Sequence, residues 1–124
     1  MTVDTRRQAV RRGRRAEMVC AARLMLGGWR ILERKLVRGR GTGAGEIDII
    51  ARRGDIVAFI EVKARADEDT AAASLLGQQR QRIIRAAEAF LQRHPDLSQC
   101  QLRFDVKVLG RGLWPKHLAD AWRP

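Results

Sequence analysis

The sequence predicts an α/β fold in which a mixed β-sheet lies between helices. Two short runs rich in Ile, Val and Phe, residues 45–51 and 56–63, flank a tight turn that contains Gly54, which is the pattern of a β-hairpin. Segments with apolar residues at helical spacing precede and follow this hairpin. The resulting order of helix, three strands, helix and strand gives an α/β sandwich around a mixed sheet.

The N-terminal third divides into an arm, a helix and a strand. Residues 1–12 lack apolar periodicity and are expected to form a flexible basic arm, so that a single domain spans residues 13–124. A helix is expected from the start of that domain, and Gly27 and Gly28 would end it. The loosely alternating residues 29–37 indicate a strand.

The part of the chain after the hairpin predicts a loop, a helix and one or two strands. Residues 64–72 indicate an acidic loop that faces solvent. Residues 73–94 have the apolar spacing of an amphipathic helix, which Pro95 would end. Residues 101–109 alternate as a fourth strand, whereas residues 114–122 are ambiguous, with a short edge strand as one interpretation.

The hairpin carries charges that a buried hairpin seldom keeps. Both strands are apolar enough to be buried on both faces, yet they include Asp48, Glu61 and Lys63. Glu61 and Lys63 share one side of their strand, about 7 Å apart, and an in-register hairpin brings Asp48 close to them. Two carboxylates and an ammonium at one edge of a sheet are the layout of a divalent-metal phosphodiesterase site, with Mg²⁺ or Mn²⁺ as the metal. The alternative is an ordinary Glu61–Lys63 ion pair, with Asp48 capping a turn.

The same residues resemble those of a known family. Glu46-Ile47-Asp48 followed by Glu61-Val62-Lys63 resembles the PD-(D/E)xK restriction-endonuclease-like superfamily. The longer pattern GEIDII…FIEVKAR resembles, more narrowly, the YraN family of small bacterial proteins, which are related to archaeal Holliday-junction resolvases. Similarities to the family's first helix and to its later strand extend the resemblance over residues 13–109. The resemblance implies a restriction-endonuclease-like three-layer sandwich with a central mixed β-sheet flanked by helices.

The resemblance also implies a role for individual residues. Asp48 and Glu61 would be metal ligands, the backbone carbonyl of Val62 would be a further ligand, and Glu17 would complete the metal shell from the first helix. Lys63 would orient the attacking water or help to deprotonate it.

Three further positions qualify this assignment. Glu46 shares the side of the strand on which Asp48 lies and is a second-tier candidate. Gln79 stands where the family usually has a Lys, so it could bind a phosphate or a water but could not supply charge. The Asn that is usual on the preceding strand is replaced near Lys35.

The charge distribution indicates a polyanionic partner. The formal net charge is +11, and residues 1–40 hold 12 of the 25 Lys and Arg but only three of the 14 Asp and Glu. A Gly-rich loop at residues 38–45 is either a flexible connector or a segment that follows a phosphate backbone. Charge alone does not distinguish a nucleic-acid-binding protein from a generally basic one. The residues expected to contact nucleic acid are Arg14, Arg15, Arg38, Arg40, Arg65, Gln79 and Arg80.

The remaining titratable and reactive residues have simpler interpretations. Arg103 and Asp105 share one face of the fourth strand and are expected to form an ion pair that locks the strand to a helix. His94 and His117 lack metal-ligand spacing and are expected to face solvent or to end a helix. Both cysteines are expected to be reduced, buried thiols.

Three function classes follow from these observations. The first is a metal-dependent endonuclease-like enzyme acting on DNA, with branched or repair intermediates suggested by the resemblance to junction resolvases alone. The second is a non-catalytic nucleic-acid-binding module with the same fold. The third, a protein–protein adaptor, would need an exposed apolar stripe, and none is expected. The chain has neither a membrane-spanning apolar run nor a signal peptide, so a cytoplasmic protein is expected, and the resolvase relatives suggest a homodimer.

Overall fold

A computed structural model of the chain describes residues 3–35, 47–63, 77–110 and 114–124, with the backbone alone for residues 3–14 and 77–78. The described residues form two α-helices, one short 3-10 helix and five strands. In chain order these are α1 (Val3–Leu26), β1 (Arg30–Arg34), β2 (Ile49–Arg53), β3 (Ile56–Lys63), α3 (Gly77–Gln92), η1 (Pro95–Leu97), β4 (Gln101–Val108) and β5 (Lys116–Trp122).

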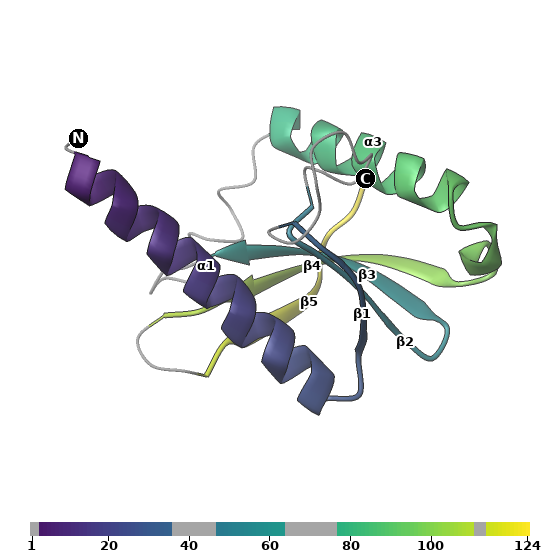
Figure 1. The fold of residues 1–124 in the computed structure, drawn as a ribbon. Helices are drawn as coiled ribbons and strands as arrows, with labels where there is room; N and C mark the ends of the chain where they lie inside the picture. Colours follow the sequence, from purple (N-terminus) through teal and green to yellow (C-terminus); the bar gives the residue numbers. More distant parts are fainter. Residues whose placement is uncertain (1–2, 36–46, 64–76, 111–113) are drawn as a thin grey trace.

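The five strands form one mixed sheet in the order β1-β2-β3-β4-β5. All neighbours pair antiparallel except β3 and β4, which run parallel. A parallel pair needs a crossover connection, and the segment that joins β3 to β4 contains α3 (Figure 1). The crossover therefore begins at the end of the sheet where β3 ends.

The two helices cover opposite faces of the sheet, so the fold has three layers (Figure 1). On the α1 face, Cys20 and Leu24 pack with Ile49 and Ile60. The larger cluster lies on the α3 face, where alternate residues of the same strands point the other way. Its buried members include Ile50, Val57, Phe59, Ile83, Ala87, Phe90, Phe104, Val106 and Trp122.

Glycine allows the backbone turns at two places. The β2–β3 register pairs Arg53 with Ile56, which leaves a two-residue loop whose first residue, Gly54, has a φ of 61°. At the end of α1, Gly28 has a φ of 88°, and the N–H of Trp29 donates to the carbonyl of Leu24 at 2.9 Å. This bond closes a Schellman motif, so the chain turns back directly into β1.

The element order agrees with the sequence-based expectation, with differences at the N-terminus and the C-terminus. The first helix begins at Val3 and not near residue 13, so most of the predicted arm has helical backbone. The ambiguous residues 114–122 contain β5, an edge strand. The Gly-rich loop at residues 38–45 lies outside the described residues. In the described part of the chain, no helix has both the length and the hydropathy that a membrane crossing requires.

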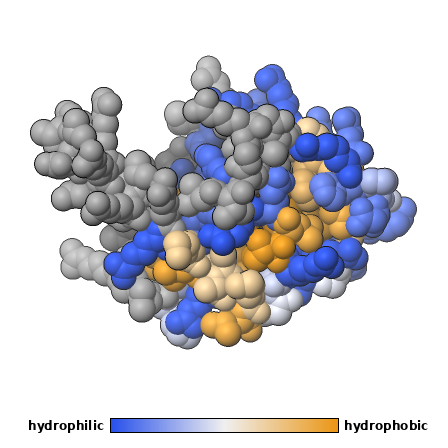
Figure 2. Space-filling model, viewed as in Figure 1, coloured by the Kyte–Doolittle hydropathy of each residue, from blue (hydrophilic) through white to orange (hydrophobic). Residues whose placement is uncertain are grey.

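The surface of α1 differs from the expectation that no apolar stripe is exposed. Met18, Met25 and Leu26 are 60%, 58% and 78% exposed, and their spacing puts them on one side of the helix. Figure 2 shows apolar surface gathered in the lower half of the view, among hydrophilic side chains. The group formed by Met18, Met25 and Leu26 is small, so it is compatible with a surface that faces solvent.

We expect Phe59 to be the most sensitive position of the α3-side core. Its ring lies 5.5 Å from that of Phe104 and 6.3 Å from that of Phe90, and the residue is 2% exposed. Phe59→Ala should lower the free energy of unfolding by about 3–5 kcal/mol, measured by urea denaturation. Leu26→Ala, at an exposed position, should change it by less than about 0.5 kcal/mol. Equal effects of the two substitutions would contradict this packing.

Candidate functional site

The predicted carboxylates lie together where β2 begins and β3 ends. Asp48 directly precedes Ile49, whose partner across the β2–β3 ladder is Ile60, so the same register puts Asp48 opposite Glu61. Alternation along β3 places Glu61 and Lys63 on the side of the sheet that faces α3. The structure therefore brings Asp48, Glu61 and Lys63 together where these two strands meet at one end, as the sequence predicts.

Asp48 is held in place by both neighbouring strands. Its Oδ2 atom accepts a hydrogen bond from the backbone N–H of Val62 at 2.9 Å. Its Oδ1 atom lies 3.8 Å from the Nζ atom of Lys35, and its backbone carbonyl accepts a hydrogen bond from the N–H of Lys35 at 2.8 Å. These contacts fix the carboxylate before any ligand binds, which is the preorganisation that a metal site needs.

Glu61 is the most perturbed carboxyl group of the site. Burial raises its pKa, the charge of Asp48 and a hydrogen bond with that side chain raise it further, and the charges of Lys63 and Lys35 offset part of the effect, so that the pKa is about 8. The residue is 9% exposed, and its Oε2 atom is buried with no hydrogen-bond partner among the described residues. A buried carboxylate oxygen without a donor is costly, and a positive charge bound there would remove the cost.

This arrangement fits a divalent metal ion. Mg²⁺ is bound in proteins by one or two carboxylates and keeps several of its waters. Asp48 and Glu61 offer two adjacent carboxylates, one of them with an oxygen that nothing in the described structure satisfies. The donor set is therefore suitable for Mg²⁺ or Mn²⁺.

Glu17, which the resemblance assigns to the metal shell, is paired with a basic residue. It is 3% exposed on α1, and its Oε1 atom accepts a hydrogen bond from the Nε of Arg34 at 3.1 Å. No group of three or more Asp, Glu, His or Cys side chains suited to a metal ion occurs in the described ranges. The structure thus pairs Asp48 with Glu61 and pairs Glu17 with Arg34. Metal ligation by Glu17, and by the carbonyl of Val62, stays a prediction.

The residues predicted to bind nucleic acid are described in part. Arg15 is exposed on α1. Gln79 and Arg80 lie in the first turn of α3 and are half-buried. The guanidinium of Arg80 lies 5.4 Å from the ring of Trp122, and its Nε atom is buried without a partner in the described structure, so part of this side chain packs against the core. The side chain of Arg14 lies outside the described part of the chain, and so do Arg38, Arg40, Glu46 and Arg65.

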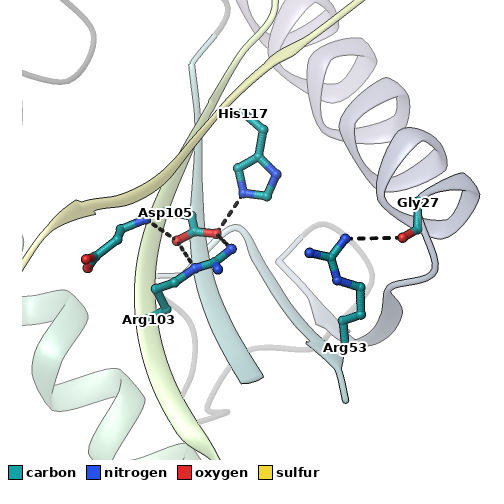
Figure 3. A network of polar contacts seen from close by, with 6 residues as sticks. Gly27, Arg53, Arg103, Asp105 and His117 are labelled. Carbon is teal, nitrogen blue, oxygen red and sulfur yellow. Dashed lines mark hydrogen bonds and ion pairs between the residues drawn. The ribbon is translucent and has the colours of Figure 1, made fainter. Parts of the chain in front are cut away.

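A second polar cluster surrounds Asp105 and includes more residues than the ion pair that the sequence predicts. Asp105, which is fully buried, accepts hydrogen bonds from the Nε and Nη2 atoms of Arg103 at 2.9 and 2.8 Å, from the backbone N–H of Asp120 at 2.8 Å and from the Nε2 of His117 at 2.7 Å (Figure 3). The expected Arg103–Asp105 ion pair is present, but the cluster ties β4 to β5 and not to a helix. His117 is part of this cluster, which corrects the expectation that it faces solvent.

The Asp105 cluster explains the irregular edge of the sheet. Phe104 pairs with Trp122 and Val106 pairs with Leu118, so three residues of β5 lie opposite Asp105 alone. The bulge turns the N–H of Asp120 toward the buried carboxylate and leaves that residue with a φ of 52°. Burial alone would raise the pKa of Asp105, but the bonds from His117, Arg103 and the Asp120 N–H outweigh it and lower the pKa to about 2.

The two thiols differ in exposure. Cys20 is buried on α1, and burial raises its pKa to about 11. A thiol with such a pKa is a weak nucleophile at neutral pH, so this residue acts as an apolar side chain. Cys100 is only half-buried, in contrast to the expectation that both thiols are buried.

The comparisons with known proteins agree on one family. The family model described as uncharacterised protein family UPF0102 matches residues 16–109. A UPF0102 protein of Paramagnetospirillum magneticum is 54% identical over 115 residues, which is 93% of this chain and 89% of the relative. A second, from Parvibaculum lavamentivorans, is 47% identical and covers 94% and 84% of the two chains. A third, from Maricaulis maris, is 45% identical and covers 96% and 91%.

We expect the metal-free protein to lose stability as the pH rises from about 5 to about 8. The pKa of Glu61 is about 8 in the folded state and 4.5 in its ordinary environment, so in this window the folded state retains a proton that the unfolded state releases. Glu61→Gln should remove this loss and be more stable than the wild type at pH 8.5. The measurement is thermal unfolding in a chelator. Glu88→Gln, at an exposed position of α3, should follow the wild type. If the Glu61→Gln variant were less stable than the wild type at pH 8.5, the ionised Glu61 carboxylate would not be destabilising.

The Asp105 cluster should contribute stability with the opposite pH dependence. A carboxyl group whose pKa falls from 3.8 to about 2 on folding stabilises the protein above pH 4, and the contribution is lost as the pH falls toward 2. Asp105→Asn should therefore cost about 3 kcal/mol or more at pH 7 and less at pH 3, measured by urea unfolding. Asp120→Asn keeps the backbone N–H and should cost less than about 0.5 kcal/mol. The cluster is not stabilising if both variants unfold like the wild type.

Proposed function

This chain belongs to the uncharacterised protein family UPF0102, and we propose that it is a metal-dependent endonuclease that hydrolyses phosphodiester bonds of DNA. The observation that carries the proposal is the Asp48–Glu61 pair, in which two carboxylates are in contact at the end of apolar strands. Such a pair destabilises the metal-free protein, and groups that are kept against stability are commonly functional.

The proposed metal site uses this pair as its centre. Asp48 and Glu61 would hold Mg²⁺ or Mn²⁺, and the resemblance to the PD-(D/E)xK superfamily adds the carbonyl of Val62 and the side chain of Glu17. When bound, the metal would supply Lewis-acid activation of a water and charge compensation at the phosphate.

The chain's own cations would act on the water and the phosphate. Lys63 lies close enough for its charge to lower the pKa of Glu61, so its ammonium is near the proposed reaction centre. It would orient the attacking water and offset charge that develops on the phosphate. The residues that would hold the DNA backbone are Arg14, Arg15, Arg38, Arg40, Arg65, Gln79 and Arg80, and the arginines among them can pair with phosphate in a bidentate geometry.

The finer assignment of fold and substrate is part of the proposal. We place the chain among restriction-endonuclease-like proteins, on the motif formed by residues 46–48 and 61–63 and on a sheet that has one described helix on each face. Branched DNA and repair intermediates are the proposed substrates, by resemblance to junction resolvases. A cytoplasmic location and a homodimer complete the proposal, since a two-fold protein suits a symmetric junction.

A second candidate is a non-catalytic nucleic-acid-binding module. It is favoured by the pairing of Glu17 with Arg34, by the lack of a group of three metal-binding side chains within the described ranges, and by Gln79 in the usual place of a Lys. In this case the basic surface would bind DNA, and the carboxylates would not contribute to any reaction.

Calorimetric titration with Mn²⁺ distinguishes the two candidates. We expect the wild type to bind the metal, and Asp48→Asn and Glu61→Gln to bind it at least about tenfold more weakly, the smallest loss typical of altered metal sites. Asp55→Asn makes the same chemical change in the exposed β2–β3 turn and should bind like the wild type.

Cleavage is measured in parallel on four-way junction, flap, duplex and single-stranded DNA at one salt concentration. A nuclease should cut at least one of these substrates, and the Asp48 and Glu61 variants should cut none. Equal and negligible metal affinity in all four proteins, with DNA binding retained, would leave the binding module as the function.

A further inference from the structure

We propose that Lys35 is the counter-cation of the Asp48–Glu61 pair in the metal-free protein. When a divalent metal ion binds to the two carboxylates, the ammonium group of Lys35 moves away and pairs with a DNA phosphate. The inference rests on the proposed function, because it assigns a role to one more residue at the same metal site. Lys35 would thus be a positioning residue that competes with the metal before binding and assists the substrate afterwards.

The backbone holds Lys35 beside Asp48. Lys35 directly follows Arg34, the last residue of β1, which pairs with Ile49. The hydrogen bond from the N–H of Lys35 to the carbonyl of Asp48, 2.8 Å long, extends the β1–β2 ladder by one bond. The side chain therefore starts from a fixed point next to the carboxylate pair.

The ammonium group is in contact with Asp48 but is not locked to it. The Nζ–Oδ1 distance of 3.8 Å is longer than a hydrogen bond, and the side chain of Lys35 is 45% exposed against 16% for that of Asp48. The neighbouring pair on β1 behaves differently, because Arg34 meets Glu17 at 3.1 Å with side chains that are 26% and 4% exposed. Lys35 can leave its partner without carrying a buried charge through the protein, whereas Arg34 is held.

Metal binding makes the net charge of the site more positive. Two carboxylates, Asp48 and Glu61, face two ammonium groups, Lys35 and Lys63, and the charges of both lysines act on Glu61. A divalent cation would balance the carboxylates alone, so both ammonium groups would then be in excess. Repulsion between the metal and the more exposed ammonium would drive Lys35 outward. There the ammonium group would pair with an anionic phosphate of the substrate.

Lys35→Gln tests both halves of the inference. In a chelator at pH 8.5, the variant should melt at a lower temperature than the wild type, because the carboxylate pair loses a counter-charge. Its affinity for Mn²⁺ should rise about fivefold, since a competing unit charge near 4 Å in a solvated site is removed. Its affinity for a short fluorescent DNA duplex in Ca²⁺, which takes similar oxygen ligands, should fall, and the salt dependence of binding should decrease by about one phosphate contact.

Arg30→Gln is the matched control. It removes one positive charge from the opposite end of the same strand, at an exposed position, so its affinity for Mn²⁺ should equal that of the wild type. Lys35→Arg keeps the charge and should retain the wild-type melting temperature in the chelator.

Each outcome supports or overturns a stated part of the proposal. An affinity of Lys35→Gln for Mn²⁺ that is equal to or below that of the wild type overturns the competition. Tighter metal binding with unchanged DNA binding overturns the transfer to phosphate. Absence of Mn²⁺ binding by the wild type overturns the proposed function and the transfer with it, and the melting temperature in the chelator then decides whether Lys35 is still a counter-cation.

Discussion

The hydrogen bond from the backbone N–H of Val62 to the carboxylate of Asp48 is the contact on which the site depends. It comes from β3, which lies between β2 and β4 at the centre of the sheet, so the donor cannot shift without disturbing both ladders. The bond uses Oδ2 of Asp48, and Oδ1 faces the ammonium group of Lys35. Because the backbone holds this carboxylate in position, the side chains of Glu61 and Lys35 must take up positions around it.

The apolar surroundings then determine the chemistry of the pair. Glu61 is placed where burial disfavours its charge, and a second carboxylate in contact adds to the effect. The fold accepts a proton or a cation there, and the charges of Lys63 and Lys35 oppose the proton because they lower the pKa of Glu61. In contrast, Asp105 is buried more deeply but has a full set of donors, so its charge is stabilised and the same residue type serves the architecture of β4 and β5. The number of donors around each carboxylate separates the two roles.

Local patterns predicted the hairpin and the carboxylate pair, whereas long-range packing decided the rest. A two-residue turn sets its own register, so the meeting of Asp48 and Glu61 follows from the residues between them. Arg34 and Glu17 are 17 residues apart, and His117 and Asp105 are 12 apart, and both contacts depend on how separate elements pack. No periodicity in the sequence specifies such pairs. The start of α1 was missed for a related reason, because a polar, arginine-rich segment can be helical without an apolar face to reveal it.

The two-residue turn at Gly54 also sets the register of the two strands that it joins. Asp48 and Glu61 are the same number of residues away from the turn on its two sides. They lie opposite each other because the turn sets the register of the two strands. A slip of the pairing by one position would bring an isoleucine opposite Glu61, with every side chain of the shifted strand on the other face. The length of a loop at the far end of the hairpin thereby becomes part of the chemical definition of the site.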